Sequence, residues 1–242
     1  MDRRNFIQTT MMAAGGILLT SAGLESSARG KENQNRKRMK VLMINGSPRQ
    51  KGNTSMALGE IARQLEKHGI DSEITWIGNK PVRGCIACNQ CRMKPGACVF
   101  NDDVCNVISA KMKEADALVI GSPVYYGQPN GALLAILQRM CYSNGGAFQG
   151  KPAAALAVCR RGGATAAFQT LNMPFQMMNM PVVSSQYWAI AYGMNPGEAA
   201  LDTEGMQTMR TLADNMAALL KATGGKPLPG SGEPWDGMNF IR

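Results

Sequence analysis

The sequence predicts an α/β fold, a doubly wound parallel sheet of five strands in the spatial order 2-1-3-4-5. Short apolar runs alternate along the chain with longer segments in which apolar residues recur at helical spacing. Turn sequences such as Asn45-Gly46-Ser47-Pro48 and Gly162-Gly163 follow the apolar runs. This alternation implies a parallel sheet with helices on both faces, and 242 residues suit one domain of this class.

Five segments are the expected strands. Residues 40–44, 117–121 and 153–158 are short, continuous and apolar, as strands buried on both faces are. Residues 70–77 alternate apolar and polar side chains, which is typical of a half-buried strand. Residues 182–188 are the expected last strand. Loops at the carboxyl ends of such strands meet at one edge of the sheet, where ligands bind.

Helices are expected between and after these strands. The apolar residues of 54–68 recur at helical spacing, and Asp102-Asp103 can cap a helix that runs to residue 114. The other expected helices are 130–142, 165–179 (with a boundary or kink at Pro174) and 201–222. The predicted domain therefore spans 40–222, with an irregular cysteine-rich insert at 80–101 and an extended tail at 223–242.

Composition and charge limit the class of protein. Apolar residues make up 45% of the chain and charged residues 18%, which excludes a disordered chain, a collagen-like repeat and a multi-span membrane protein. The net charge is +9, which is one signature of a nucleic-acid-binding module. Because much of the excess lies between Arg29 and Lys40, we expect no nucleic-acid partner, and assign the rest to an anionic cofactor or substrate.

Residues 1–28 are typical of an export signal. Arg3-Arg4 is followed by Phe6-Ile7, a weakly apolar run from Met11 to Leu19, and small residues that suit a cleavage site. The pattern resembles a twin-arginine signal, which carries folded proteins across the membrane. It predicts a periplasmic protein without stable membrane insertion, because the apolar run is too short to span a bilayer. Residues 29–39 are the expected basic linker.

The loop after the first strand predicts a phosphate site. It joins a strand to a helix, so the first amides and the dipole of that helix face an anion there. Polar side chains that can add to this site are Ser47, Arg49, Asn53, Thr54 and Ser55. The loop is neither a Walker loop nor the Gly-x-Gly-x-x-Gly dinucleotide loop. A purely structural alternative is that Ser and Thr only cap the helix while Arg49 is solvated.

Two motifs together resemble a known family. Gly46-Ser47-Pro48-Arg49-x-x-Gly52-Asn53-Thr54-Ser55, with Ser122-Pro123-Val124-Tyr125-Tyr126-Gly127 downstream, is similar to the FMN reductases of flavodoxin-like fold. The resemblance implies that the flavin phosphate binds at Ser47, Arg49, Asn53, Thr54 and Ser55. It places the isoalloxazine ring beside Pro123, Val124, Tyr125, Tyr126 and Gly127. After the next strand, Gly162 and Gly163 allow close backbone approach to the ring, and Arg160 or Arg161 can balance its negative charge.

The cysteine insert resembles that of the iron–sulfur flavoproteins. Cys85, Cys88, Cys91 and Cys98 form a C-x2-C-x2-C motif with a fourth cysteine, a pattern that suits a [4Fe–4S] cluster. A structural zinc ion, disulfides formed after export, and unliganded thiols are the alternatives. Cys105, Cys141 and Cys159 are expected on helices or at a strand end, as buried thiols.

The expected function is electron transfer between FMN and the cluster or an external acceptor. The alternatives are an NAD(P)H-dependent FMN or quinone reductase without a cluster, and an exported electron carrier without catalysis. Expected partners are a redox protein, a quinone or NAD(P)H, and the resemblance implies a homodimer or tetramer. His68 is the only histidine, so no Ser-His-Asp triad can form, and the sequence identifies no catalytic residue.

Overall fold

The structure of this protein is a computed structural model that describes residues 38–230 and 232–234. The predicted export signal and residues 29–37 of the predicted linker lie outside the described residues, and the prediction for them stays untested. Within the part of the chain that the structure describes, no helix is both long and apolar enough to cross a bilayer.

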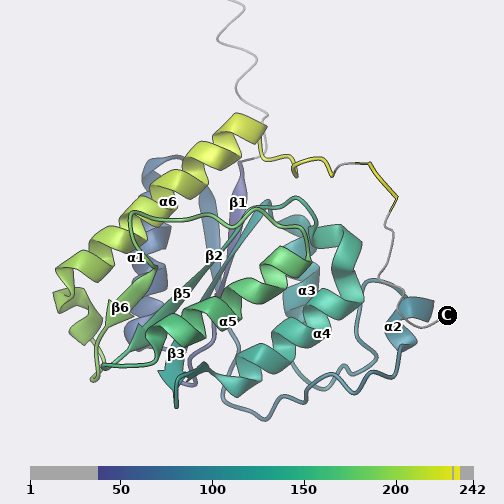
Figure 1. The fold of residues 1–242 in the computed structure, drawn as a ribbon, viewed down its shortest axis with the longest axis horizontal. Helices are drawn as coiled ribbons and strands as arrows, with labels where there is room; N and C mark the ends of the chain where they lie inside the picture. The colour runs from purple at the N-terminus through teal and green to yellow at the C-terminus, as the bar shows by residue number, and fades with distance from the viewer. Residues whose placement is uncertain (1–37, 231, 235–242) are drawn as a thin grey trace, which may run out of the picture. The chain divides into compact units, whose positions relative to one another are not determined.

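The sheet has five parallel strands in the order β2-β1-β3-β5-β6 (Figure 1). These strands are β1 (Lys40–Asn45), β2 (Asp71–Trp76), β3 (Ala117–Tyr125), β5 (Ala153–Cys159) and β6 (Ile190–Tyr192). A two-residue strand, β4 (Gln128–Pro129), pairs antiparallel with the end of β3. Counted over the parallel strands alone, the order is 2-1-3-4-5, so the predicted topology is confirmed.

Helices cover both faces of the sheet (Figure 1). One face carries α1 (Asn53–Lys67) and α6 (Thr203–Thr223), and the other carries α3 (Cys105–Glu114), α4 (Gly131–Phe148) and α5 (Ala164–Met177). Two short elements, α2 (Gln90–Met93) and the 3-10 helix η1 (Glu198–Leu201), lie in connecting segments. The sheet is thus the middle layer of three.

Strand β1 shows why the sequence forms this architecture. Its side chains alternate between the two layers: Val41 and Met43 join the core on the α1–α6 side, whereas Leu42 and Ile44 join the core on the α3–α4–α5 side. A strand buried on both faces needs apolar residues at every position, which explains the continuous run in the sequence. Strand β3 follows the same rule through residues 117–120.

The predicted last strand is wrong. The strand is β6, whereas residues 182–188 make only one isolated bridge, between Val182 and Ala153. This segment bonds to α6 instead: the Ser185 hydroxyl donates to the Thr208 carbonyl (2.7 Å), and the Asn215 amide donates to the Ser184 carbonyl (2.9 Å). Because Tyr187 and Trp188 are half exposed, the apolar pattern there reflects a surface rather than a strand.

Other boundaries differ more modestly from the prediction. Strand β3 continues through Pro123 to Tyr125, and α4 runs to Phe148 with a non-helical residue at Asn144. The Asp103 carboxylate accepts from the Cys105 amide (3.0 Å) just before α3, but the N-cap residue is Val104, which makes no side-chain cap, so the predicted Asp102-Asp103 cap is wrong. The described part of the tail is extended, and the Leu228 amide donates to the Gly150 carbonyl (2.8 Å).

Candidate functional site

A cleft of about 180 Å³ lies at the carboxyl ends of the parallel strands. It is lined by residues of four loops and of the first turn of α1: Ser47, Arg49, Gly52, Asn53, Thr54, Pro123, Val124, Tyr125, Val158, Cys159, Arg160, Gly193, Met194 and Pro196. Eight of the predicted flavin residues are therefore brought together here. The others, Ser55, Tyr126, Gly127, Arg161, Gly162 and Gly163, do not line the cleft.

Side chains of β1 and β2 hold the loop that follows β1. Buried Asn45 accepts from the Ser47 amide (3.0 Å) and donates to the Gln50 carbonyl (3.2 Å). The Trp76 indole donates to the Ser47 carbonyl (2.7 Å) from the neighbouring strand. Gly46 has no room for a side chain, because a Cβ atom there would lie 2.5 Å from Leu133. The loop is therefore held by hydrogen bonds from β1 and β2.

The first turn of α1 presents backbone donors to the cleft. The first helical hydrogen bond runs from the Met56 amide to the Gly52 carbonyl, so the amides of residues 53–55 precede the helical ladder. The Ser55 hydroxyl accepts a hydrogen bond from the Gly52 amide (2.9 Å) and donates one to the Gly52 carbonyl (2.8 Å). Ser55 thus caps the helix, and exposed Arg49 is the cation beside these amides.

Asn53 has a different role from the one expected. Its amide nitrogen donates to the Asn195 carbonyl (2.9 Å) rather than pointing freely into the cleft. Its carbonyl oxygen accepts from the amides of Gly197 (3.1 Å) and Ala199 (3.2 Å). Asn53 therefore joins the start of α1 to the loop after β6 and shapes the cleft through that loop.

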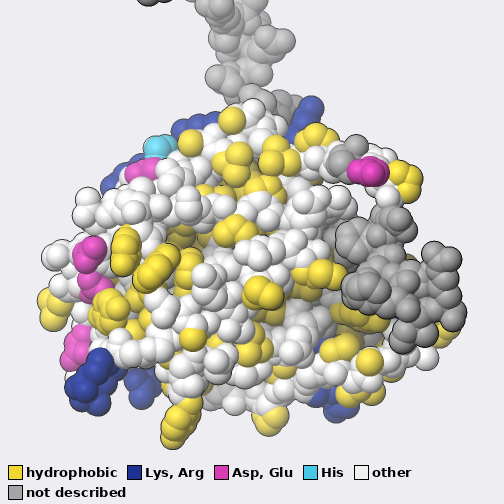
Figure 2. Space-filling model, in the orientation of Figure 1, with side chains coloured by type: hydrophobic (Ala, Val, Ile, Leu, Met, Phe, Trp, Pro, Cys, Tyr) yellow, Lys and Arg dark blue, Asp and Glu magenta, His cyan; other side chains and the backbone are white. Residues whose placement is uncertain are grey.

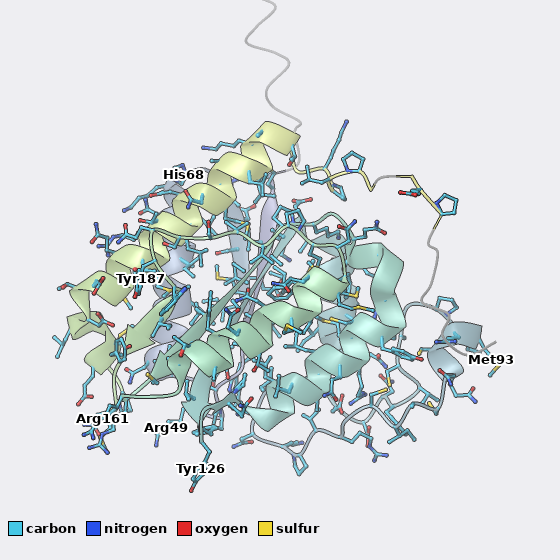
Figure 3. The ribbon with its side chains drawn as sticks, viewed as in Figure 1. Arg49, His68, Met93, Tyr126, Arg161 and Tyr187 are labelled. Atoms are coloured by element: carbon cyan, nitrogen blue, oxygen red, sulfur yellow. The ribbon has the colours of Figure 1, made fainter. Side chains whose placement is uncertain are left out.

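The end of β3 forms one wall of the cleft through residues 123–125, and a tight turn follows it. Tyr126 has a φ of 50° and is fully exposed, and Gly127 has a φ of 78°. Gly163 packs against this turn so closely that a Cβ atom on it would lie 2.7 Å from the Gly127 Cα. Figure 3 shows Arg49, Tyr126 and Arg161 at the same end of the sheet, with Tyr126 extended away from the body of the protein. The glycines therefore serve loop packing, and Val124 and Tyr125 face the cleft.

Sequence reasoning missed the wall formed by Gly193, Met194 and Pro196. The misplaced last strand hid this loop, although Asn195-Pro196-Gly197 is a turn signal that points to it. Backbone amides of Met194 (2.7 Å) and Asn195 (2.9 Å) donate to the Glu198 carboxylate, and hydrogen bonds of this kind lower the pKa of Glu198. Buried Cys159 also lines the cleft, and its burial raises the pKa of the thiol.

The four cysteines of the insert line a second, smaller pocket against α4. Cys85, Cys88, Cys91 and Cys98 share this pocket with the apolar side chains of Ile86, Val99 and Phe100. All four are free thiols, and the Ala87 amide donates to the Cys85 sulfur (3.4 Å). Among the described residues, no three metal-ligating side chains are grouped in the way a single metal ion requires.

The other cysteines lie apart from this set. Cys105 begins α3 and is buried, as predicted, whereas Cys141 lies on α4, as predicted, but is only half-buried. Burial raises the pKa of Cys105 to about 11 and the pKa of Cys141 to about 12. Both thiols therefore stay neutral at pH 7, unlike the thiolates that bind metal.

Arg139 on α4 connects both ends of the insert, and sequence reasoning missed it. Its side chain is fully buried and forms an ion pair with Asp103. It donates to the Cys98 sulfur (3.3 Å), to the Arg83 carbonyl (3.2 Å) and to the Phe100 carbonyl (2.9 Å). The signal in the sequence is a single charged residue, an arginine, in the largely apolar segment 132–141. An arginine is almost never fully buried unless its charge is paired, and the partners of Arg139 hold the insert against α4.

Tyr142 fixes the middle of the insert. Its hydroxyl donates to Asn89 (2.7 Å) and accepts from Arg92 of α2 (3.1 Å), whose guanidinium also lies over the Tyr142 ring. Ala87 and Asn89, which lie between the first cysteines, have left-handed backbone conformations (φ of 54° and 57°). These contacts turn the C-x2-C-x2-C segment back toward α4.

The cleft and the cysteine pocket are separate in one chain. They share no lining residue. Helix α4 starts beside the cleft, where the Asn130 amide donates to Ser122 (2.9 Å), whereas Arg139 lies nine residues further on, about 13 Å along the helix. The cysteine pocket therefore lies against α4, and none of the four cysteines lines the cleft.

Comparison with known proteins defines the class of this chain. A doubly wound sheet with a phosphate-type loop at its carboxyl edge is a flavodoxin-like protein. Residues 39–195 match the family model described as NADPH-dependent FMN reductase, and the chain belongs to this family. It is accordingly an FMN-binding, flavin-dependent oxidoreductase.

The curated relatives are iron–sulfur flavoproteins. One from Methanocaldococcus jannaschii is 34% identical over 191 residues, covering 76% of this chain and 98% of the relative. One from Methanosarcina thermophila is 32% identical over 189 residues, covering 76% and 96% respectively.

Solved structures share the fold. RosB with a bound 8-demethyl-8-formylriboflavin-5′-phosphate has a TM-score of 0.59 at 16% identity, covering 84% of this chain and 96% of RosB. A flavodoxin from the domain Archaea has a TM-score of 0.52 at 17% identity, covering 76% and 99%. At these identities the likeness concerns the fold alone.

Proposed function

We propose that this protein is an exported electron-transfer flavoprotein that binds FMN in the cleft and a [4Fe–4S] cluster at Cys85, Cys88, Cys91 and Cys98. Electrons would pass between the flavin, the cluster and an external redox partner. FMN supplies two-electron chemistry, and a cluster supplies one-electron chemistry. The convergence of all four cysteines on one pocket carries the proposal.

The cleft suits the two ends of FMN. The amides at the start of α1, the Ser47 and Thr54 side chains and Arg49 would hold the phosphate. Pro123, Val124 and Tyr125 form an apolar wall against which the flat flavin ring would pack, with backbone groups beside the ring's polar edge. Arg160 would balance negative charge on the ring. These residues bind and orient the flavin and exclude water from one side of it.

The cysteine pocket suits a cluster in its donors and its surroundings. Four thiolates provide the ligand set, and Ile86, Val99 and Phe100 provide an apolar wall. The Arg139 guanidinium and the Ala87 amide donate to two of the sulfurs, and hydrogen bonds to the sulfurs are among the contacts by which proteins tune such clusters. A structural zinc ion held by the same thiolates is the alternative, which metal analysis of the purified protein distinguishes.

The predicted location affects the electron donor. NAD(P)H is a cytoplasmic pool, so a protein exported to the periplasm would take electrons from a quinol or a redox protein. The family model favours NADPH as the alternative donor. Steady-state oxidation of NADPH by the purified protein in the presence of free FMN tests this alternative, and rapid turnover would contradict the quinol or protein donor.

The first experiment is to measure iron, zinc, sulfide and flavin in protein purified without oxygen. About four irons and one FMN per chain are expected from the proposed ligand set. One zinc ion and no iron per chain would show that the four cysteines hold a structural zinc ion instead of a cluster. FMN without any metal would leave a cluster-free reductase, and thiol counting would then show whether the four cysteines form disulfides.

A further inference from the structure

A groove of about 1370 Å³ lies between α4, the end of α5 and the described part of the tail. Figure 2, which looks onto α4 and α5, shows hydrophobic side chains across the middle of this face and charged side chains around its margin. Small-molecule pockets typically measure about 300–1,000 Å³. The groove exceeds that range, so its size suits a peptide segment. The described residues that line it are Gln138, Cys141, Tyr142, Gly145, Gln149, Gln176, Met177, Met178, Asn179, Gly230, Gly232, Glu233 and Pro234.

One stripe of α4 forms the floor of the groove. Its lining residues Gln138, Tyr142, Gly145 and Gln149 recur every three or four positions, which places them along one side of the helix. A Cβ atom on Gly145 would lie 3.9 Å from the Met178 Cε, so Met178 lies beside this stripe. No charged side chain of α4 or α5, both fully described, lines the groove. The floor is therefore uncharged along its length.

The described part of the tail leads into this groove. Figure 1 shows it leaving the end of α6 and running toward the α4 side of the molecule. The Leu228 amide donates to the Gly150 carbonyl (2.8 Å), and a Cβ atom on Gly150 would lie 2.1 Å from the Leu228 carbonyl oxygen. A Cβ atom on Gly230 would lie 2.8 Å from the Gln149 side-chain nitrogen. The tail is therefore packed against the end of α4, and Pro234 lines the groove.

The sequence continues for eight residues beyond Pro234, and these lie outside the described residues. Half of the eight are large and apolar: Trp235, Met238, Phe240 and Ile241. In residues 223–234, by contrast, Leu228 is the one large apolar residue apart from proline. Eight extended residues span at most about 26–29 Å, whereas the α4 stripe from 138 to 149 is about 17 Å long. The segment is thus long enough and apolar enough to fill the groove.

We propose that residues 235–242 bind the groove between α4 and α5 of their own chain. Their apolar side chains would pack against Met177, Met178 and Tyr142. The covalent tether favours this occupant over a separate molecule, because it holds the segment near the groove at a local concentration of about millimolar. Large apolar side chains are unfavourable in water, and an uncharged groove buries them without desolvating a charge.

Tyr142 connects the groove to the cysteine pocket. It lines both, and its hydroxyl bonds to Asn89 and Arg92 of the insert. A segment packed against Tyr142 would therefore cover the side of the cysteine pocket that adjoins the groove. This consequence rests on the proposed function: with a cluster at the four cysteines, the segment would restrict the access of water and chelators to it.

Hydrogen–deuterium exchange of the full chain, followed by mass spectrometry, tests the docking without reference to any cofactor. The amides of residues 236–242 should exchange at least about tenfold more slowly than those of a free peptide of the same sequence. This protection should stay constant over about a hundredfold range of protein concentration, because docking within one chain does not depend on concentration. Exchange as fast as in the free peptide would overturn the proposal. Protection only at high concentration would also overturn it, and would assign the groove to a second copy.

Two pairs of variants test the contact from both sides. Phe240→Glu should remove the protection, whereas the matched control Asn239→Glu places the same charge at a polar position and should keep it. Met177→Glu should also remove the protection, because it places a charge in the groove. Its control is Met173→Glu, on the same helix but outside the groove. Positions 177 and 173 are 83% and 63% exposed, so both variants should fold. Protection equal to that of the controls would contradict the proposal.

A chain that ends at Pro234 tests the cover over the cysteine pocket. Purified without oxygen, it should lose iron to a chelator several-fold faster than the full chain, with its FMN content unchanged. Equal rates of iron loss would overturn the cover. Absence of iron from both forms would contradict the proposed cluster instead, and the exchange rates of residues 236–242 would still decide whether the segment docks.

Discussion

The cleft at the carboxyl ends of the strands, which we propose binds FMN, and the cysteine pocket are built in opposite ways. The cleft is formed by loops at the ends of four parallel strands, and backbone contacts such as Gly163 against Gly127 set its shape. The cysteine pocket is formed by an insert with little regular structure, and it depends on side chains of α4, above all Arg139 and Tyr142. The cleft is a property of the fold, whereas the cysteine pocket is formed by a segment added to that fold.

This difference predicts different sensitivity to mutation. Many groups in the cleft would contact FMN, so each side chain would contribute only a fraction of the binding free energy. In the cysteine pocket a single ligand or a single buried arginine holds the arrangement. Four predictions, from the largest expected effect to the smallest, test this contrast.

Cys98→Ser should abolish the cluster while FMN stays bound. A [4Fe–4S] cluster needs four thiolates, so iron should fall from about four to below one per chain. Iron and flavin analysis of protein purified without oxygen measures both. Cys141→Ser, outside the ligand set, is the control and should keep its iron. Loss of FMN together with iron would show that the two regions depend on each other.

Arg139→Met should destabilise the protein by about 3–5 kcal/mol, because it leaves the Asp103 carboxylate buried without its partner. The free energy of unfolding in urea measures this. Adding Asp103→Asn removes the unpaired charge and should recover part of the loss. A change below about 1 kcal/mol would mean that water reaches this ion pair, contrary to its burial.

Arg49→Ala should weaken FMN binding by about tenfold, the size expected for one charged hydrogen bond at an exposed site. Fluorescence titration of the apoprotein with FMN gives the dissociation constant. Riboflavin, which lacks the phosphate, should bind both forms equally. Arg63→Ala is the control, since exposed Arg63 lies on α1 outside the cleft. An equal loss for riboflavin would place Arg49 near the ring instead.

Glu73→Gln should have the smallest effect and touch neither region. Hydrogen bonds from Lys111 and Lys40 lower the pKa of Glu73 from 4.5 to about 2. Because the pKa is lower in the folded state, this contribution is present above pH 4.5 and is lost as the pH falls toward 2. The side chains are about one-third exposed, so about 1 kcal/mol is expected. Acid unfolding curves should differ only in that window.

The fold could be predicted largely from local patterns. The buried strands at 40–44, 117–121 and 153–158 were identifiable because continuous apolar runs between turn signals are rare outside such strands. The last strand was misplaced because Tyr187 and Trp188 look like core residues in the sequence. Only the tertiary structure shows that they face outward while Ile190 and Ala191 are buried.

The candidate sites were predictable to different degrees. The cleft loops were found because they follow strands directly, and a turn after a strand end has one possible location in this topology. The positions of Asn53 and Arg139 could not be derived, because their partners are about 140 and 40 residues away in sequence, as in the bonds to Gly197 and Cys98. Hydrogen bonds over such separations leave no local pattern.

The sequence by itself determined the α/β class, the positions of four of the five parallel strands, the phosphate-type loop and the four-cysteine motif. Each of these depends on residues that are close along the chain, so periodicity and spacing suffice to predict them. Only the tertiary structure shows where the insert lies, that Arg139 holds it, and which apolar residues form a surface instead of a core. These features arise when distant segments pack together, and packing depends on shapes that the sequence does not state locally.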